Sequence, residues 1–326
     1  METKTFIGID ISSATLDICV SRNGESKSFI IGNEAKEVTR FFRKYNSKKV
    51  IVGMENTGRH NWVLYEALAG LRCAVYVIAP LHLKKSLGLV RGKNDKIDAV
   101  RIAAFIESNY TKLTIWKPAS KAIQKLKVLL TERNRRIKIR KQMQVAQHDY
   151  SKMKKLGLEK PLLALSKKLI TDFNNQITNI EKQIQQLIEQ DESLKQQAEL
   201  IQSVPGVGKV LCWTILAKTQ GFTLIDDPRK MACYSGVVPF AERSGTSIRG
   251  RYKVSVYADK SLKSLLHLSS MSAIRLNNDL RVYYQRKVLE GKNKMSVLNA
   301  VRNKIIHRIY AVIKNQTPYS NSLVLS

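Results

Sequence analysis

The chain has 326 residues and carries 56 lysines and arginines against 26 aspartates and glutamates, a net charge of +30. Apolar residues make up 44% of the sequence, which is enough for hydrophobic cores and excludes wholesale disorder. A compact chain this basic repels itself unless a polyanion neutralises it, so nucleic acid or an anionic membrane surface is the expected partner. The length suits at least two domains.

Membrane and secretory classes are not expected. No stretch approaches the roughly 18 uninterrupted apolar residues of a membrane-spanning helix. The amino-terminal stretch METKTFIGIDIS has no long apolar core and no small-residue cleavage site, so it does not resemble a signal peptide. The four cysteines lie far apart without a CxxC pair, which disfavours a zinc site or a disulfide framework. A reducing cytoplasm fits these features.

The positive charge is unevenly distributed. Residues 117–160 carry a net +11 and residues 243–314 a net +13, whereas residues 1–116 carry +7 and residues 161–242 carry −1. Two segments therefore hold most of the surplus. The modestly basic first third is expected to serve something other than bulk phosphate binding.

The first region alternates between strand and helix patterns. Three short β-rich runs, TFIGIDIS, LDICVSR and KSFIIGN, predict a three-strand meander. A helix over residues 33–45, a buried strand KKVIVGMEN, a helix over residues 61–70 and a buried strand CAVYVIAP follow. The segment KNDKIDAVRIAAFIES then predicts a helix, and the whole region reads as α/β.

Residues 119–200 read as entirely helical. A hydrophobic seam with heptad-like spacing runs through Ile177, Ile180, Ile184, Leu187 and Leu194. Asp191 falls in a gap of that seam. Two interpretations stay open at this point, an antiparallel hairpin within one chain or a coiled coil between chains.

The third region opens with two apolar helical stretches around Pro-Gly-Val-Gly, the pattern of a helix–hairpin–helix. Gly206 and Gly208 would let backbone amides approach a phosphate oxygen, and Lys209 begins the second helix. The alternative is an ordinary corner between two helices. Residues 259–314 predict two or three basic helices without aromatic RNA-stacking motifs.

Four acids stand at special places in the predicted α/β region. Asp10 interrupts an apolar central strand, where an unpaired carboxylate is costly to bury without a cation. Glu55 follows a second buried strand, at the end where α/β sheets place their sites. Asp95 and Asp98 are three apart in a helix and share one face. Two-metal phosphoryl transfer needs such a convergence of carboxylates.

Each acid also has an ordinary structural explanation. Asp95 and Asp98 could be helix residues favoured by the dipole or by solvent, and Glu55 could simply end a strand. The joint pattern is harder to explain this way, and Asp10 hardest of all. We expect an apolar stripe to turn the helix onto the sheet through Ile97, Val100, Ile102 and Phe105.

The order GID, MENTG, KNDKIDA resembles ribonuclease-H-like (RuvC-like) nuclease domains of the DEDD type. It is similar to the DEDD insertion-sequence transposases related to the Piv DNA invertase, the insertion-sequence family one hundred and ten. The resemblance covers essentially the whole chain and includes the helix–hairpin–helix and the later segment YSGVVPFAERSGTSIRGR. It implies a RuvC-like domain over residues 1–112, a helical or coiled-coil linker over 113–200, and a mainly α domain over 201–326 with a catalytic serine loop.

The family's serine motif, P-x-x-x-x-S-G-x-S-x-R-G, is matched from Pro239 to Gly250. Ser244 occupies the position of the nucleophile. Arg249 and Arg251 could bind a phosphodiester and stabilise charge that develops on it. Without the resemblance, a basic loop that contacts the DNA backbone would be the simpler interpretation. No histidine or lysine adjoins Ser244 as an obvious base.

The resemblance implies a DNA transposase, a serine recombinase that excises and inserts a mobile element. Asp10, Glu55, Asp95 and Asp98 would bind Mg²⁺ (or Mn²⁺) and act with Ser244 in a composite site. The implied partners are donor DNA, target DNA, a structured noncoding guide RNA that base-pairs with both, and further copies of the chain in a dimer or tetramer. The implied place of action is the prokaryotic cytoplasm, at the nucleoid.

Functions of other classes are open on the residues alone. A Holliday-junction-type or structure-specific Mg²⁺ nuclease would use the same acids, and a non-catalytic nucleic-acid-binding protein would leave them inert. An actin-like sugar kinase is disfavoured by the charge and by the lack of a second phosphate hairpin. A tyrosine recombinase is disfavoured because His307, Arg308 and Tyr310 lack the H-x-x-R spacing.

Overall fold

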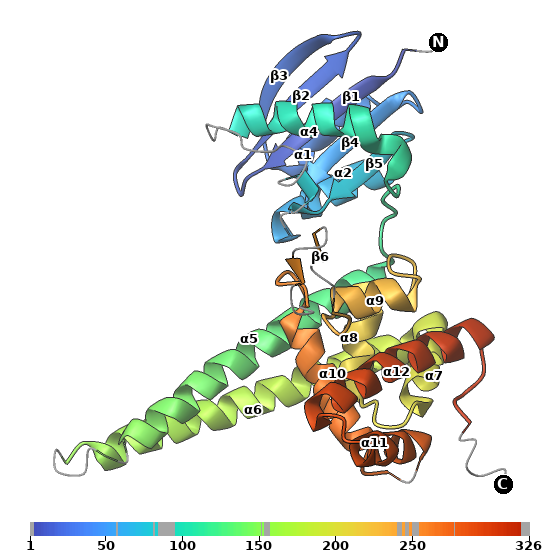
Figure 1. Cartoon of the computed structure of the whole chain (residues 1–326). Helices are drawn as coiled ribbons and strands as arrows, with labels where there is room; N and C mark the ends of the chain where they lie inside the picture. The colour runs from blue at the N-terminus through green and yellow to red at the C-terminus, as the bar shows by residue number, and fades with distance from the viewer. Residues whose placement is uncertain are drawn as a thin grey trace. The chain divides into compact units, whose positions relative to one another are not determined.

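The computed structural model of the chain describes residues 3–56, 58–80, 82–83, 95–150, 152, 157–239, 243–244, 248–249, 254–276 and 278–320, with 59, 243–244 and 248–249 described by their backbone alone. The chain divides into two compact units, residues 1–118 and residues 119–326 (Figure 1). Each unit has its own hydrophobic core. The finer division into three segments stays a prediction. None of the described helices has the length and apolar character needed to cross a membrane.

A five-stranded mixed sheet organises the first unit. Its strands are β1 (Thr5–Ile11), β2 (Thr15–Arg22), β3 (Glu25–Gly32), β4 (Val50–Glu55) and β5 (Ala74–Ile78). They lie in the order β3-β2-β1-β4-β5, with an antiparallel β1–β2–β3 meander and parallel β1, β4 and β5. The predicted meander and the two later strands are confirmed. The α/β class is confirmed as well, in the mixed-sheet form of a ribonuclease-H-like domain.

Helices cover both faces of this sheet. They are α1 (Ala35–Arg43), α2 (Trp62–Ala69) and α4 (Asp95–Asn109), with short 3-10 turns η1 (Gly58–Asn61) and η2 (Tyr110–Lys112). Because side chains alternate along a strand, the isoleucines of β1 pack on one face with α1 and α2. The opposite face is packed against α4, which crosses the front of the sheet in Figure 1.

The second unit is mainly helical, as predicted. Its elements are α5 (Lys121–Tyr150), α6 (Glu159–Gln190), α7 (Glu192–Ser203), α8 (Lys209–Thr219), α9 (Pro228–Tyr234), β6 (Arg243–Ser244), β7 (Ile248–Arg249), α10 (Lys260–Ala273), α11 (Asp279–Leu289) and α12 (Lys294–Asn315). The basic carboxyl-terminal region forms three helices, α10 to α12. The two helical stretches around Pro-Gly-Val-Gly are confirmed as α7 and α8, joined by a turn. Both a helix–hairpin–helix and an ordinary corner have this arrangement.

Helices α5 and α6 form a long antiparallel hairpin. Side-chain hydrogen bonds from arginines of α5 to residues of α6 link the two helices: Arg133 to Glu181 at 2.7 Å, Arg136 to Gln176 at 2.8 Å and Arg140 to Asn174 at 2.7 Å. The seam isoleucines of α6 pack in the same core as apolar residues of α5. In the described seam, therefore, the first of the two interpretations holds, a hairpin within one chain.

Asp191 explains the gap in that seam. Its side chain accepts a hydrogen bond from the amide of Leu194 at 3.0 Å and so caps α7. A residue at an N-cap satisfies an amide that the helix leaves unpaired. The hydrophobic pattern therefore continues across a break between two helices, not along one coiled coil.

Candidate active site

Asp10 lies near the end of the central strand β1, on the face that α4 covers. Burial raises the pKa of its carboxyl group to about 6. The hydrogen bond from the Ile11 amide, at 3.0 Å, works in the opposite direction. The negative charges of Asp95, Asp98 and Glu55 raise the pKa further. The other three predicted acids therefore act electrostatically on Asp10.

Glu55 ends β4, which runs parallel to β1. The register pairs Ile9 with Met54, so Asp10 and Glu55 each follow one residue later at the carboxyl ends of neighbouring strands. The buried Asn61 donates a hydrogen bond from Nδ2 to the backbone oxygen of Glu55 at 2.9 Å. This contact ties the end of β4 to the following 3-10 turn and fixes the backbone that carries the acid.

Two glycines, Gly8 and Gly53, allow α4 to pack closely against the sheet, and we call this contact the glycine seat. Gly8 of β1 and Gly53 of β4 pair directly in the parallel register. A Cβ atom at Gly8 would lie 2.2 Å from the backbone oxygen of Ala99, and one at Gly53 would lie 2.1 Å from Cγ1 of Ile106. Such distances are impossible, so α4 packs closer to the sheet than any side chain would allow. The sequence prediction did not use these glycines, although glycine inside a strand signals a close approach.

The packed face of α4 differs in part from the predicted stripe. Its buried residues are Ala99, Ile102, Ala103 and Ile106. Ile97 and Val100 are 43% and 39% exposed, so the prediction was wrong for them. Phe105 is only partly buried. The physical reason is the helical repeat: the buried residues recur at steps of three, four and seven and form one face, to which Ile97 and Val100 do not belong.

Asp95 and Asp98 occupy the first turn of α4. Asp98 forms an ion pair with Arg101 at 2.7 Å, one turn further along the helix. Both aspartates act on the pKa of Asp10, which means that the sheet acids and the helix acids are near one another. The close seat of α4 is what brings the two sets together.

Asp17 is a further acid at this place that the sequence prediction missed. It lies on β2 directly opposite Asp10 in the antiparallel register. Its exposure is only 8%. Burial raises the pKa of its carboxyl group, and the charge of Asp95 raises it further. Its position in LDICVSR, between two apolar residues of a strand, was the available signal.

The acids fit a divalent cation by donor type. Carboxylate oxygens are the ligands that Mg²⁺ and Mn²⁺ prefer. The raised pKa of Asp10 reflects burial first and then the like charges of the neighbouring acids. Within the described ranges, no three histidine, cysteine, aspartate or glutamate side chains are close enough to hold an ion as they stand. A bound cation would therefore draw the carboxylates closer together.

The serine predicted as nucleophile lies in a short antiparallel ladder. Ser244 belongs to β6, and the neighbouring pair in the ladder joins Arg243 of β6 to Arg249 of β7. The backbone therefore brings two arginines next to the serine position in the ladder. Arg251 and residues 245–247 lie outside the described residues.

The two ends of the serine segment are joined at its base. The amide of Asp259, just before α10, donates a hydrogen bond to the backbone oxygen of Tyr234, the last residue of α9, at 2.8 Å. The carboxylate of Asp259 caps α10 by accepting from the Leu262 amide at 3.0 Å. It also forms an ion pair with Lys218 of α8 at 2.9 Å. Residues 235–258 thus begin and end at one anchored point.

The pKa of Asp259 agrees with its role in joining the two ends of the serine segment. Burial alone would raise the pKa of Asp259, but the hydrogen bonds from Ser261, the Leu262 amide and Lys218, with the lysine's charge, lower it to about 2. Asp259 is therefore ionised at neutral pH and holds all three of these partners. This acid was also missed in the sequence, where an aspartate ahead of a helix is an N-cap signal.

The turn of the helix–hairpin–helix assigns different roles to its two glycines. Gly206 has a φ of +84° and sits where a Cβ would lie 2.5 Å from the backbone oxygen of Ser269 on α10. Gly208, before the exposed Lys209, has open space around it. Gly206 therefore serves packing, and only Gly208 and Lys209 face outward, where a phosphate could approach.

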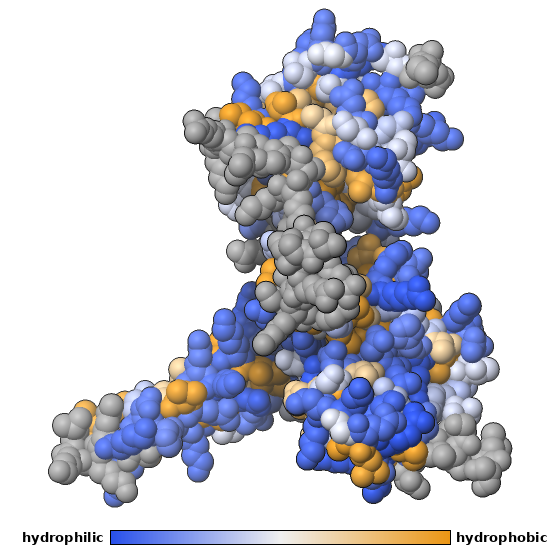
Figure 2. Space-filling model, in the orientation of Figure 1, coloured by the Kyte–Doolittle hydropathy of each residue, from blue (hydrophilic) through white to orange (hydrophobic). Residues whose placement is uncertain are grey.

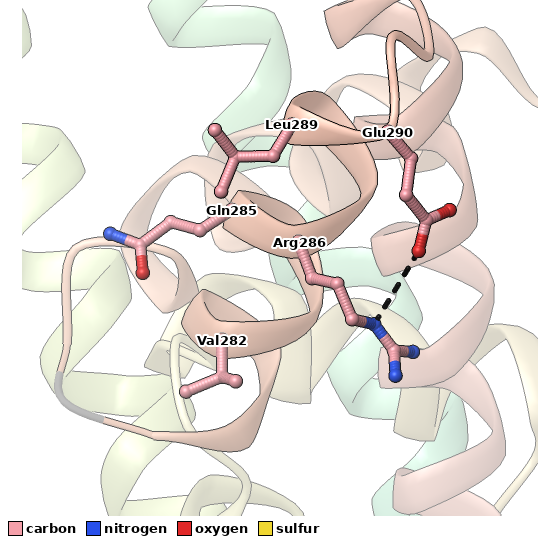
Figure 3. A pocket seen from close by; sticks show the side chains of 5 residues that line it. All are labelled: Val282, Gln285, Arg286, Leu289 and Glu290. Carbon is pink, nitrogen blue, oxygen red and sulfur yellow. Dashed lines mark ion pairs between the residues drawn. The ribbon is translucent and has the colours of Figure 1, made fainter.

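Two other features do not form a reactive site. Tyr310 is buried, and its hydroxyl donates to the backbone oxygen of Ile225 at 2.8 Å, which argues against a tyrosine nucleophile there. An open groove on α11 is lined by Val282, Gln285, Arg286, Leu289 and Glu290 (Figure 3). Its charged residues pair with each other, Arg286 Nε to Glu290 Oε1 at 3.8 Å.

Comparisons with known proteins identify the family of the chain. A DEDD transposase model matches residues 7–148, and the transposase IS116/IS110/IS902 family model matches residues 198–285. The pilin gene-inverting proteins of Moraxella bovis and Moraxella lacunata are each 26% identical over 98% of this chain and 99% of their own length. An uncharacterized 42 kDa protein of insertion element IS900 from Mycobacterium paratuberculosis is 30% identical over 37% of this chain and 31% of its own length.

The two matched segments contain the four acids and the serine, respectively. A DEDD transposase domain implies the use of a divalent metal, and a transposase binds DNA. The chain therefore belongs to the IS116/IS110/IS902 family of transposases, related to the pilin gene-inverting proteins, and is an enzyme that cleaves and rejoins DNA.

Proposed function

We propose that this transposase excises and inserts a mobile DNA element with Ser244 as its nucleophile. In this proposal Asp10, Glu55, Asp95 and Asp98 hold Mg²⁺ (or Mn²⁺). The observation that carries the proposal is the gathering of these acids on the α4 face of the sheet, where Asp10 has a pKa of about 6. Carboxylates kept together at this energetic cost are expected where a cation binds.

The reaction is a transesterification at phosphorus. The Ser244 oxygen forms a bond to the phosphorus of a phosphodiester, and the bond from phosphorus to one deoxyribose oxygen breaks. The hydroxyl proton leaves the serine, and the departing sugar oxygen takes up a proton. One phosphodiester replaces another, so rejoining by attack of a DNA hydroxyl on the serine ester needs no ATP.

Bound Mg²⁺ would supply charge that stabilises the phosphoryl oxygens and eases ionisation of the attacking hydroxyl. The close contact of Gly8 and Gly53 with α4 holds the helix against β1 and β4 and would keep the aspartates of its first turn near Asp10. Arg249 sits in the same two-stranded ladder as Ser244 and would bind the phosphate and its developing charge. The anchor at Asp259 would keep the serine segment in place.

Nucleic-acid binding would come from the basic segments. Residues 117–160 include α5, whose hairpin with α6 has a mainly hydrophilic surface in Figure 2. Gly208 and Lys209 would bind backbone phosphate at the start of α8. A guide RNA that base-pairs with donor and target DNA would explain a protein rich in phosphate-binding charge and poor in base-reading motifs. The proposed place of action is the prokaryotic cytoplasm, at the nucleoid.

The far part of the α5–α6 hairpin supports a homo-oligomer, a dimer or tetramer. Large apolar side chains lie exposed there: Val145, Leu158, Leu165 and Leu169. Figure 2 shows hydrophobic patches toward this end of the hairpin. On α6 these leucines recur at four- and seven-residue steps, the spacing of one helix face. A second copy of the hairpin would cover them.

An excision assay in cells tests the proposed function. The element is placed on one plasmid and the protein is supplied from another, and the excised junction is quantified. Ser244→Ala should abolish the junction, whereas the neighbouring Thr246→Ala and Ser247→Ala should retain it. Co-purified RNA is sequenced in parallel, and an element-encoded RNA is expected. Full excision by Ser244→Ala would contradict the serine's role.

A further inference from the structure

Asp17 of β2 is an acid that is largely buried and has no partner for its charge among the described residues. It is 8% exposed and lies on β2, and α4 contacts both β2 and its neighbour β1. Its carboxylate has no hydrogen-bond or ion-pair partner among the described residues. A carboxylate that is largely shielded from water and has no partner is disfavoured in its charged form unless it is neutralised or meets a cation.

The register directs Asp17 toward the proposed metal site. Asp10 and Asp17 are directly opposite one another in the antiparallel β1–β2 pair. Opposite residues place their side chains on the same face, with Cβ atoms about 5 Å apart, and like charges there are destabilising. Asp95 of α4 acts on both of them. Asp17 and Asp10 therefore face the same first turn of α4.

We infer that Asp17 is a fifth carboxylate of the divalent-cation site, facing the ion from β2 beside Asp10. Two observations carry this independently of the sequence resemblance: the direct opposition to Asp10 and the burial without a partner. The inference rests on the proposed function, since it takes the cation from there. A further carboxylate would strengthen the binding of a hard cation.

Mn²⁺ binding to the full-length protein, freed of nucleic acid, tests this inference. Mn²⁺ affinity is measured at pH 7.5 by titration calorimetry and by the loss of free Mn²⁺ signal in electron paramagnetic resonance. Asp17→Asn should weaken binding by about 10-fold or more, the usual effect of removing a group that supports a metal site. Asp17→Glu should recover part of the affinity. Asp149→Asn, an exposed acid of α5, is the matched control and should bind like wild type.

Thermal unfolding without metal separates a cation-site acid from a structural one. Asp17→Asn should raise the midpoint by about 2 °C or more, since it removes a buried like charge. A fall in the midpoint of Asp17→Asn, reversed by Asp17→Glu, would identify a structural side chain and overturn the inference.

The two proposals fail in different ways. If Asp10→Asn loses Mn²⁺ affinity and Asp17→Asn retains it, the role of Asp17 is refuted and the proposed metal site stands. If neither variant changes Mn²⁺ affinity, the metal site itself is refuted, and the role of Asp17 falls with it.

Discussion

In the first unit the four acids of the proposed metal site stand on strands and a helix that share packed cores, whereas in the second unit the proposed serine nucleophile belongs to the segment between α9 and α10. The acids are positioned by tertiary packing, above all by the contact of α4 with Gly8 and Gly53. The serine segment is held at its base, through Asp259, Tyr234 and Lys218.

The two regions also differ in net charge. The first 116 residues carry +7 and gather acids at one place, whereas residues 243–314 carry +13 around and after the serine. A metal site needs a local excess of carboxylates, and a DNA-binding segment needs cations. In the proposed function, one reaction divides its electrostatic requirements between an acidic face held by packing and a basic segment held at its base.

The largest effect is expected at the centre of the acidic face. Asp10→Asn keeps the shape of the side chain and removes its charge, so strand cleavage should fall by at least about 100-fold, as when a group that stabilises developing charge is lost. Cleavage of a labelled donor DNA measures this. Because like charges are relieved, the metal-free protein should not become less stable. If Asp10→Asn cleaves at the wild-type rate, the Asp10 carboxylate takes no part in the reaction.

The pH dependence of metal binding should follow the raised pKa of Asp10, about 6. A proton competes with the cation below that pH, so Mn²⁺ affinity should fall by up to about 10-fold per pH unit from pH 6 to pH 5. For the metal-free fold the sign is opposite. An acid with a raised pKa costs stability once ionised, so stability should decrease as pH rises from about 4 through 6. Titrations and melts of wild type and Asp10→Asn test both signs, and identical profiles would contradict this pKa.

The glycine seat gives the next effect. Gly8→Ala forces a methyl group into the backbone of α4 and should destabilise the first unit by about 1–3 kcal/mol, the usual cost of overpacking. Cleavage should fall too, because the first turn of α4 shifts away from Asp10. Gly70→Ala is the control, since open space surrounds Gly70 and its φ is ordinary. The stability of both variants is measured by denaturant unfolding, and their activity by the rate of cleavage. If Gly8→Ala and Gly70→Ala behave alike, the close contact of α4 with Gly8 does not position the acids.

The anchor of the serine segment should give a smaller change in stability. Asp259→Ala removes an N-cap and should cost about 1 kcal/mol. Asp191→Ala is a matched control, because Asp191 caps α7 with the same hydrogen bond to the third residue on, at 3.0 Å. Well below the unfolding temperature, only Asp259→Ala should slow cleavage. If both variants slow it equally, the anchor has no special role.

Single lysines of the basic segment should give the smallest effect. Replacing one exposed lysine of α5, such as Lys125→Gln, should weaken binding to DNA or RNA a few-fold and lower the slope of log affinity against log salt by about one unit if it contacts phosphate. Binding is measured at several salt concentrations. An unchanged slope would mean that the side chain faces away from the nucleic acid.

Much of the fold could be predicted because its signals are local. Alternating apolar residues predict β1 and its neighbours, and the same alternation turns Asp10 away from the isoleucine core. The positions of Glu55 and of the two α4 aspartates follow from strand ends and helix spacing. The serine has no comparable signal, since a loop has no periodicity, and its role depends on family resemblance.

The features that could not be predicted depend on which elements meet. The seam of α6 is compatible with a partner in the same chain or in another, and only the packing against α5 decides between them. Ile97 looks like a core residue until the contact with Gly8 and Gly53 fixes which face of α4 is buried. Asp17 looks like an ordinary strand residue until β2 pairs it with Asp10 beneath α4.

The most direct test of the account is to trap the covalent intermediate. Purified protein is incubated with donor DNA and Mg²⁺, denatured and digested, and the DNA-linked peptide is identified by mass spectrometry. The account predicts a phosphoester on Ser244 that requires a divalent cation and is absent from Ser244→Ala and Asp10→Asn. A DNA link on another residue, or complete strand exchange by Ser244→Ala, would contradict it.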